Sequence, residues 1–393
     1  MRHVLLQRTA SPFKERQREV VERKGPGHPD TLCDAISEEL SRALCNYYIE
    51  ETGSVQHHNV DKVLLVGGGS RAGFGSGRIT QPIELIISGR AVLEIGGEKI
   101  PIESIVQGVV REIFGKLLPR LDIETELKVA IKLKPGSKDL RATFEAHTDI
   151  PLANDTSIGI GYAPFTPLEL GIKQLSQHLA GDQVRQKHPA LGTDIKIMGV
   201  RDEEGTNITI AAAMIGPLLK NKDEYSNLIH SLQNESYSII RLQTKPNIHI
   251  NKADLPEKDS FYLTVTGSSV EAGDDGMTGR GNRHTGLITP FRLMSLEAAA
   301  GKNPVSHVGK IYNVVSMLIA QDLAEIKGIN DATCVMVSQI GKPITEPQFI
   351  SIKINHGLSE KEVNDSTKEV VDFNFQKMPD VWKGILEGKY QLY

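Results

Sequence analysis

Helical patterns alternate along this chain with pairs of apolar segments joined by very short turns, and this alternation constrains the fold more than any other feature. Residues 126–133 and 140–148 are joined by "KPGSKD", and residues 194–200 and 207–215 are joined by "RDEEGT". Turns of this kind connect neighbouring strands, and a connection this short makes the two strands antiparallel. The pattern therefore favours hairpins over the parallel sheet of a doubly wound fold.

Six helical patterns accompany these strand pairs. Apolar residues recur at intervals of three and four after Pro29, and the same spacing returns in "ESIVQGVVREIFGKLL". The other four patterns lie near residues 167–187, 223–242, 307–326 and 360–388. Six helices suggest three units of two helices, with boundaries near residues 125 and 250. We therefore expect an α+β fold of three interleaved units, each an antiparallel sheet covered by helices.

Charge and composition exclude several classes of function. The net charge is −4, without the basic excess that nucleic-acid-binding proteins show, so neither nucleic acid nor a membrane surface is expected as a main partner. The three cysteines are an odd number without a CxxC pair or a His/Cys metal spacing, so neither a disulfide framework nor a zinc site is indicated; they are Cys33, Cys45 and Cys334. No segment has the pattern of a signal peptide or the roughly 20 apolar residues that span a bilayer. A cytoplasmic location is expected.

The stretch "ERKGPGHPDTLCDAISEEL", residues 22–40, predicts a helix that begins at Pro29, because proline suits the first helical position. The free N–H groups at a helix N-terminus attract anions. Asp30 in the first turn could hold Mg²⁺ bridging to phosphate oxygens, and His28 would face the same space. A simple helix cap with a surface histidine is the alternative, which "GHPD" alone would favour.

A second group of charges lies in the glycine-rich residues 267–292 and the following "AGKNPVSHVGKIYN". Arginine and lysine suit polyphosphate oxygens, carboxylates can bind an amine or Mg²⁺, and glycines let the backbone approach a ligand closely. The mixture suits a metal–nucleotide substrate, and the alternative is an exposed loop with solvated charges. The charged residues are Asp274, Asp275, Arg280, Arg283, Arg292, Lys302, His307 and Lys310.

Three other features carry less functional weight. The loop from Gly67 to Gly77 resembles a phosphate cradle but lacks the GK[ST] ending, so a hairpin or surface loop is predicted. His57 and His58 could be metal ligands, yet no third ligand is suitably spaced, and their role stays open. Cys33 is predicted to be a small core residue of the first helix.

Four spaced segments, "ERKGPGHPDTLCDAIS", "NDTSIGIGYAP", "GDDGMTGRGNR" and "GKNPVSHVGKIYN", resemble those of the S-adenosylmethionine synthetases, also called methionine adenosyltransferases, in their archaeal form. The resemblance runs from about residue 20 almost to the C-terminus and keeps the order of the motifs. It implies three related α+β units around a pseudo-threefold axis. It also implies a homodimer with active sites between the subunits.

The chemistry implied by this resemblance has two steps. The sulfur of L-methionine displaces the whole triphosphate from C5′ of ATP, and the bound tripolyphosphate is then hydrolysed to pyrophosphate and phosphate. Cations around the triphosphate stabilise its developing charge, and alignment of sulfur with C5′ lowers the barrier further. Sulfur needs no general base.

The resemblance also assigns roles to residues. His28 matches a histidine near the leaving phosphate, and Asp30 matches a magnesium ligand. Asp155 matches an aspartate that holds the methionine ammonium group. Asp194 and Lys196 match a pair that contacts the ribose and the triphosphate.

Further roles fall in the last two motifs. Asp274 matches an aspartate on the methionine side of the site. Arg280 and Lys302 match residues that bind phosphate. Asp275 and His307 join them as candidate ligand-binding residues.

Departures from the bacterial and eukaryotic pattern affect both the cations and the metals. A lysine follows "GHPD" in those relatives, where this chain has Thr31. A basic residue follows the arginine of the glycine loop, where this chain has Gly281, and Arg283 is the nearest substitute.

The metal ligands also differ. The second magnesium ligand of bacterial relatives aligns nearest to Gly309, with His307 close by, and their potassium-binding glutamate aligns nearest to Gln56. Mg²⁺ is therefore the expected cofactor, with K⁺ as a second candidate.

Two other hypotheses compete with the synthetase. A non-catalytic, nucleotide-binding relative would keep the fold but lack part of the cationic set, against which Lys196, Arg280 and Lys302 argue. A phosphotransferase would need a carboxylate that orients the nucleophile beside the γ-phosphate, and the sequence offers no clear one.

Overall fold

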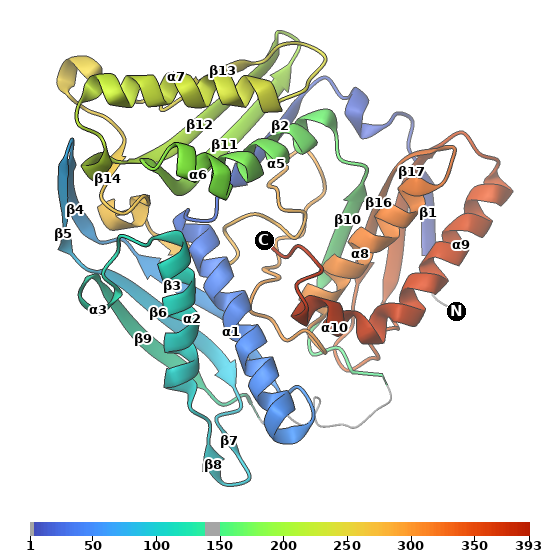
Figure 1. The fold of residues 1–393 in the computed structure, drawn as a ribbon. Helices are drawn as coiled ribbons and strands as arrows, with labels where there is room; N and C mark the ends of the chain where they lie inside the picture. The colour runs from blue at the N-terminus through green and yellow to red at the C-terminus, as the bar shows by residue number, and fades with distance from the viewer. Residues whose placement is uncertain (1–3, 138–149) are drawn as a thin grey trace.

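The computed structural model describes residues 4–137 and 150–393, which form three main β-sheets, each with helices packed against one face (Figure 1). Each sheet and its helices enclose a separate cluster of buried apolar side chains. Helices and sheets are thus combined in an α+β fold, as the sequence predicts.

The first sheet has the strand order β15-β3-β6-β9, and helices α1 and α2 pack together against it. Leu32 and Ile36 on one side of α1 are fully buried in this cluster. The bounds are α1 (Pro29–Thr52), β3 (His58–Val66), β6 (Ile83–Ala91), α2 (Ile102–Leu117), β9 (Leu127–Lys134) and β15 (Gly276–Met277). The helix α1 begins at the proline that predicted its start.

The second sheet has the order β13-β12-β11-β2, with β14 paired to β12, and is covered by α5, α6 and α7. The antiparallel pair β11–β12 confirms the predicted hairpin with the turn "RDEEGT". The bounds are β2 (Glu19–Lys24), α5 (Pro167–Ala180), α6 (Asp182–Lys187), β11 (Leu191–Asp202), β12 (Gly205–Ile215), α7 (Lys222–Ile239), β13 (Asn247–Ile250) and β14 (Leu263–Thr264).

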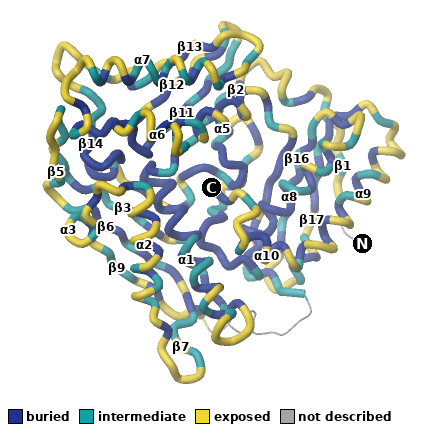
Figure 2. Tube along the Cα trace, in the orientation of Figure 1, coloured by how far each residue is buried: buried dark blue, intermediate teal, exposed yellow. Residues whose placement is uncertain are grey.

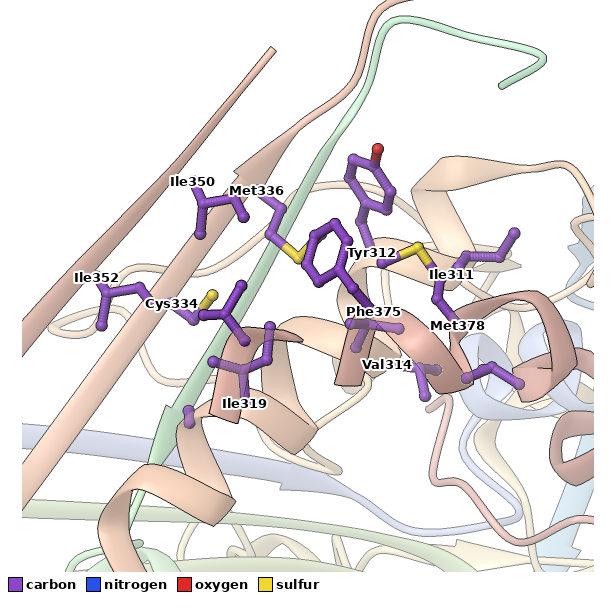
Figure 3. Packing of buried hydrophobic residues seen from close by; sticks show 14 of the residues in the cluster. Ile311, Tyr312, Val314, Ile319, Cys334, Met336, Ile350, Ile352, Phe375 and Met378 are labelled. Atoms are coloured by element: carbon purple, nitrogen blue, oxygen red, sulfur yellow. The ribbon is translucent and has the colours of Figure 1, made fainter. Parts of the chain in front are cut away.

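The third sheet has the order β1-β17-β16-β10 and is covered by α8, α9 and α10. Figure 3 shows Tyr312 of α8, Phe375 of α9 and Met336 of β16 meeting in its apolar cluster. The bounds are β1 (Val4–Arg8), β10 (Ile158–Ala163), α8 (Val308–Glu325), β16 (Ile329–Val337), β17 (Phe349–His356), α9 (Glu360–Lys377) and α10 (Val381–Leu386).

The sheets are mixed, which corrects the prediction of wholly antiparallel sheets. The pairs β6–β9, β12–β13 and β1–β17 are parallel. In the first two pairs a helix lies between the strands in sequence, and such a crossover allows a parallel return. The second strand of the predicted first hairpin, residues 140–148, lies outside the described residues. The unit boundaries near residues 125 and 250 and the pseudo-threefold arrangement stay predictions.

The glycine-rich loop from Gly67 to Gly77 belongs to a hairpin, as predicted, formed by β4 and β5. A smaller hairpin pairs β7 with β8. The bounds of these and the remaining short elements are β4 (Gly69–Gly73), β5 (Ser76–Gln81), β7 (Glu94–Ile95), β8 (Glu98–Lys99), α3 (Ile123–Glu126) and the 3₁₀ helices η1 (Phe13–Glu15), η2 (Gly216–Leu218), η3 (Pro256–Lys258), η4 (Ser269–Ala272) and η5 (Met378–Asp380).

Burial is concentrated along the inner sides of the helices and in the strands beneath them (Figure 2). The hairpin β7–β8 and the outer side of α7 are largely exposed. No helix among the described residues is long and apolar enough to cross a membrane.

Two charges expected near a nucleotide instead link parts of the fold. Arg292 pairs with Glu169 at 2.7 Å, and Lys310 of α8 pairs with Glu38 of α1 at 2.7 Å. All four side chains are at most 4% exposed. Arg292 and Lys310 therefore form structural ion pairs whose side chains are buried inside the molecule.

Candidate functional site

His28 caps the N-terminus of α1. Its Nδ1 accepts a hydrogen bond from the backbone N–H of Asp30 at 3.2 Å, and Pro29 occupies the first helical position. A neutral imidazole that accepts at Nδ1 carries its proton on Nε2. The ring is therefore fixed as a cap while Nε2 stays available as a donor.

The glycines before His28 bring the start of α1 against β11. The backbone N–H of Gly27 donates to the carbonyl oxygen of Thr193 at 3.0 Å. A Cβ atom on Gly27 would lie 2.1 Å from Thr193 Oγ1, so a larger residue does not fit without a shift. This close approach sets the helix N-terminus beside Asp194 and Lys196, far away in sequence.

A cleft of about 510 Å³ lies at this junction. It brings together seven of the predicted site residues, from the α1 N-terminus, from β11 and from the glycine-rich loop after η4. Those seven residues are His28, Asp30, Asp194, Lys196, Asp274, Asp275 and Arg280. The other lining residues are Lys24, Ala211, Tyr262, Ser269 and Gly273.

Asp30 ties the glycine-rich loop to the start of α1. One carboxylate oxygen accepts from Lys24 Nζ at 2.8 Å and the other from the backbone N–H of Met277 at 3.0 Å. Lys24 Nζ also donates to the carbonyl oxygen of Arg280 at 2.8 Å. The loop that carries Arg280 is thus held at the cleft by this lysine and this carboxylate.

Asp194 is buried at the side of the cleft and accepts hydrogen bonds from Ser269 at the start of η4. Its Oδ2 accepts from the backbone N–H of Ser269 at 2.8 Å and from Ser269 Oγ at 2.6 Å. Burial, with a smaller contribution from the charge of Asp274, raises the pKa of Asp194 to about 6 against the opposing effect of the Ser269 hydrogen bonds. Ser269 Oγ also lies 3.0 Å from Asp274 Oδ2, so the single hydroxyl proton of this serine is shared between the two carboxylates.

The cleft combines positive and negative side chains around a neutral histidine. Burial, together with the charge of Lys24, lowers the pKa of His28 to about 4 against the opposite effect of Asp30. Lys196 Nζ lies 3.6 Å from Glu22 Oε1 and is 43% exposed, so it can reach a ligand. Three cations, Lys24, Lys196 and Arg280, therefore line a cleft that opens at a helix N-terminus, which suits phosphate groups.

The carboxylates of the cleft fit a magnesium ion that is shared with a phosphate. Mg²⁺ is commonly held by one or two carboxylates together with water and substrate oxygens. Asp30, Asp274 and Asp275 supply hard oxygen donors along one cleft. Within residues 4–137 and 150–393, no group of three or more His, Cys, Asp or Glu side chains is arranged to hold a metal ion by itself.

A second polar cluster surrounds Lys302 and does not line the cleft. Lys302 Nζ donates to Asp61 Oδ2 at 2.6 Å and lies 3.3 Å from Glu297. Burial opposes the charge of Lys302, but Asp61 and Glu297 outweigh it and raise the pKa of this lysine. His307 caps α8 through a 3.2 Å hydrogen bond from the Gly309 N–H, and burial lowers its pKa well below the usual value.

The cleft and the Lys302 cluster lie toward opposite ends of strand β3. Lys302 forms a β-bridge with Asn59, whereas the glycine loop pairs with β3 through Gly276 and Leu65. A strand rises about 3.3 Å per residue, so Asn59 and Leu65 are separated by roughly 20 Å. One chain therefore does not gather all the predicted phosphate-binding residues at one place.

Asp155 and Arg283 also lie outside the cleft lining. Asp155 is exposed before β10 and accepts from the N–H of Thr156 at 2.7 Å. Arg283 donates to the carbonyl oxygens of Gly279 and Gly281, at 2.5 and 2.8 Å. Arg283 thus supports the shape of the glycine-rich loop.

The site also contains residues that the sequence did not single out. Lys24 and Ser269 contact its carboxylates, Tyr262 lines the cleft, and Asp61 pairs with Lys302. Lys24 stands within the quoted stretch "ERKGPGHPD", so its position before the glycines was a usable signal. The other three have no motif of their own, because contacts between distant segments define them.

His58, at the start of β3, uses both ring nitrogens in contacts within the fold. His58 is buried, with Nε2 2.8 Å from Ser41 Oγ and Nδ1 3.0 Å from the carbonyl oxygen of Gln56. Cys33 is buried in α1, as predicted, and Cys45 of the same helix is buried as well. His58 therefore acts as a polar link between α1 and β3.

Comparison with known proteins gives a consistent family. The chain matches the family described as S-adenosylmethionine synthetase (AdoMet synthetase) over residues 3–389. It is 45% identical over 388 residues to a probable S-adenosylmethionine synthase of Aquifex aeolicus, covering 97% of each chain. It is 42% identical to the S-adenosylmethionine synthase of Methanocaldococcus jannaschii, covering 99% of each, and 45% identical to that of Pyrobaculum neutrophilum, covering 98% of each.

Proposed function

Because the chain belongs to the S-adenosylmethionine synthetase family, we propose that it is a methionine adenosyltransferase that makes S-adenosylmethionine from ATP and L-methionine. The main structural support for this proposal is the cleft at the N-terminus of α1, which identifies the residues involved. There, three cations face carboxylates and a neutral histidine, as a metal-bound triphosphate requires.

The first step in this proposal is attack of the methionine sulfur on C5′ of ATP, with the whole triphosphate as leaving group. Lys196 and Arg280 bind the triphosphate and stabilise the charge that develops as the C–O bond breaks. His28 remains neutral near pH 7 and can donate from Nε2 to an oxygen of the leaving group without bringing a second full charge. No residue need remove a proton from sulfur.

The second step in the proposal is hydrolysis of the tripolyphosphate to phosphate and pyrophosphate. Mg²⁺ bound with the triphosphate would neutralise part of its charge in both steps. Asp30 is the proposed ligand, because it lies in the first turn of α1 where phosphate would approach. Asp274 and Asp275 are further candidates, and a requirement for K⁺ and a cytoplasmic location stay predictions.

The proposed active enzyme is a homodimer whose sites combine residues of both subunits. The separation of the cleft from Lys302 supports this proposal, since Lys302 and the cleft residues Lys196 and Arg280 all match phosphate-binding positions of the family. Strands β3, β6 and β9 also carry half-buried apolar residues in register, Leu64, Ile86 and Ala130, outside the cluster covered by helices. A second chain packed on this sheet face would cover them and add its Lys302 to the cleft.

The direct test is to incubate the purified protein with ATP, L-methionine, Mg²⁺ and K⁺ and to separate the products by chromatography. We expect S-adenosylmethionine with equal amounts of phosphate and pyrophosphate, and a loss of product in the Lys196→Met variant. Omission of K⁺ in a parallel reaction tests that cofactor. ATP binding without S-adenosylmethionine would reject the proposal in favour of a non-catalytic relative.

A further inference from the structure

The glycine-rich β4–β5 hairpin lies against a segment of the chain that forms a large part of the cleft, residues 261–275. Figure 1 shows β4 and β5 extending from the first sheet to β14 of the second sheet. The hairpin itself, residues 67–81, contributes no residue to the cleft lining, so it can act on the cleft only through this segment. The lining residues that the segment carries are Tyr262, Ser269, Gly273, Asp274 and Asp275.

The base of the hairpin packs directly on the backbone of this segment. The N–H of Gly67 donates to Asp275 Oδ1 at 2.8 Å. The N–H of Gly68 donates to the carbonyl oxygen of Val270, also at 2.8 Å. A Cβ on Gly67 would lie 2.6 Å from the carbonyl carbon of Gly273, so a larger residue does not fit without a shift. This contact between two backbones holds the turn that precedes β15.

The tip of the hairpin is anchored beside the second sheet. The N–H of Gly75 donates to the carbonyl oxygen of Leu219 at 2.7 Å. Next to it, the ring of Phe74 packs edge-on against Tyr225 and Phe261, with ring centroids 6.3 and 5.5 Å away. Edge-to-face contacts of this kind favour one orientation of the rings. Phe74 therefore holds the start of the segment, immediately before the cleft residue Tyr262.

Between its base and its tip, the hairpin also contacts the middle of the segment. A Cβ on Gly77 of β5 would lie 2.8 Å from Val265 Cγ2. The segment is paired with β12 as well, through Leu263 and Thr264. It thus has one partner in the second sheet and another in the hairpin, and the hairpin contacts both of its ends.

We propose that the β4–β5 hairpin positions residues 261–275 for binding of the nucleotide substrate, with Phe74 as the positioning residue at its tip and Gly67 at its base. This inference rests on the proposed function, because it takes ATP as the ligand of the cleft. When a segment must first be ordered, the apparent affinity falls in proportion to the fraction of molecules in which it is already in place. The hairpin keeps this fraction high.

The first experiment measures binding of ATP with Mg²⁺ to the full-length protein by calorimetry, without L-methionine. Phe74→Ala should raise the dissociation constant by about tenfold or more, whereas Phe74→Tyr, which keeps the ring, should stay within about threefold of the wild type. Phe373→Ala removes an exposed ring of α9 and is the matched control, with wild-type affinity expected. An unchanged dissociation constant in Phe74→Ala overturns the proposal.

The base of the hairpin is tested separately with Gly67→Ala, which places a methyl group against Gly273 and should also weaken ATP binding by about tenfold. Its control is Gly108→Ala in α2, where an added Cβ meets nothing within 4 Å. Phe74→Leu replaces Phe74→Ala should that variant fail to fold, with an expected loss of about threefold or more. Unchanged ATP binding in Gly67→Ala contradicts the role of the base.

Steady-state kinetics separates positioning from a general loss of folded enzyme. In Phe74→Ala the KM for ATP should rise by about tenfold, while kcat at saturating ATP stays within about threefold, because bound ATP restores the position of the segment. A lower kcat with an unchanged KM would mean that less enzyme is folded and would overturn the positioning role.

Hydrogen–deuterium exchange locates the effect in the chain. Peptides covering residues 261–275 should exchange faster in Phe74→Ala than in the wild type, and equal exchange overturns the proposal. Failure of the two proposals is distinguishable. A wild type that binds ATP but forms no S-adenosylmethionine rejects the proposed function alone, whereas equal ATP affinity of the wild type and Phe74→Ala rejects the role of the hairpin alone. A wild type that does not bind ATP rejects both.

Discussion

Lys24 supplies a positive charge at the cleft, where the sequence lacks the lysine that follows "GHPD" in bacterial and eukaryotic relatives. The position after Asp30 holds Thr31, which is only 5% exposed, where bacterial and eukaryotic relatives have a lysine. Lys24 comes from the end of β2, yet its Nζ lies 2.8 Å from Asp30 and lines the same cleft. The cation beside Asp30 is therefore supplied by a residue from a different position in the sequence.

Replacement of Lys24 by Met should lower kcat by about ten- to a hundredfold, as expected when one charge that stabilises the transition state is removed. Lys24→Arg keeps the charge and should retain most of the activity. Steady-state kinetics with ATP and L-methionine measures both variants, with the exposed Lys116→Met as the matched control. A kcat for Lys24→Met within twofold of the wild type would exclude this role.

Asp34 explains why position 281 is glycine in this chain. A Cβ on Gly281 would lie 2.3 Å from Asp34 Oδ2, so the basic side chain of bacterial relatives does not fit here. Asp34 Oδ1 accepts from the Gly279 N–H at 2.8 Å. Burial raises the pKa of Asp34 to about 7, although the Gly279 hydrogen bond and Arg283 oppose this change.

Asp34 should therefore make stability depend on pH. Its ordinary pKa is about 3.9, so between about pH 4 and 7 the folded protein keeps a proton that the unfolded chain has lost. The resulting stabilisation is complete below pH 4 and disappears as the pH rises through 7. Thermal unfolding of wild type and Asp34→Asn, at equal protein concentration from pH 5 to 8, should show a steeper relative loss for the wild type. Parallel profiles would contradict the assignment.

At the scale of elements, α1 and α8 are joined by the buried pair of Glu38 and Lys310, 2.7 Å apart. Glu38 Oε2 also accepts from the N–H of Gly301, next to Lys302. The pair therefore links the helix that starts at the cleft to the helix capped by His307.

The variant Lys310→Met leaves Glu38 buried without its main partner and should destabilise the protein by about 3–5 kcal/mol. Glu38→Gln combined with Lys310→Met removes both charges and should recover part of that loss. Equilibrium denaturation measures the free energy of unfolding. The exposed pair of Lys383 and Asp380 is the control, since Lys383→Met should cost less than about 1 kcal/mol. Equal losses of unfolding free energy in Lys310→Met and Lys383→Met would mean that the buried pair contributes no more to stability than the exposed pair.

At the scale of the whole molecule, the separation of Lys196 from Lys302 predicts complementation between inactive variants. If each site takes Lys196 from one subunit and Lys302 from the other, a mixed dimer of Lys196→Met and Lys302→Met has one intact site. Random pairing makes about half of the dimers mixed, so co-expression should recover about a quarter of the wild-type activity.

The assay compares the co-expressed mixture with each variant alone, each expected to be about a hundredfold or more below wild type. Mixing of the same variant expressed with two different tags is the control for co-expression. A mixture no more active than its components would place both lysines in one subunit's site, or in no shared site.

The sequence by itself determined the features that depend on neighbouring residues. Pro29 marked the start of α1, "RDEEGT" predicted the β11–β12 hairpin, and the glycine, histidine and aspartate motifs predicted seven of the cleft residues. The helix start and the hairpin follow from local propensity, which a short stretch of chain already fixes, whereas Asp194 and Lys196 were assigned to the site only through the family resemblance of the motifs.

Only the tertiary structure decided which of the charged residues meet. Arg292 and Lys310 have the same chemistry as Arg280, yet they lie in buried ion pairs, and Lys302 lies at the other end of β3. The parallel strand pairs and the hydrogen bond between Lys24 and Asp30 were also decided only by the tertiary structure. The physical reason is that such contacts join segments far apart in sequence, so they are set by how the three apolar clusters pack and not by local pattern.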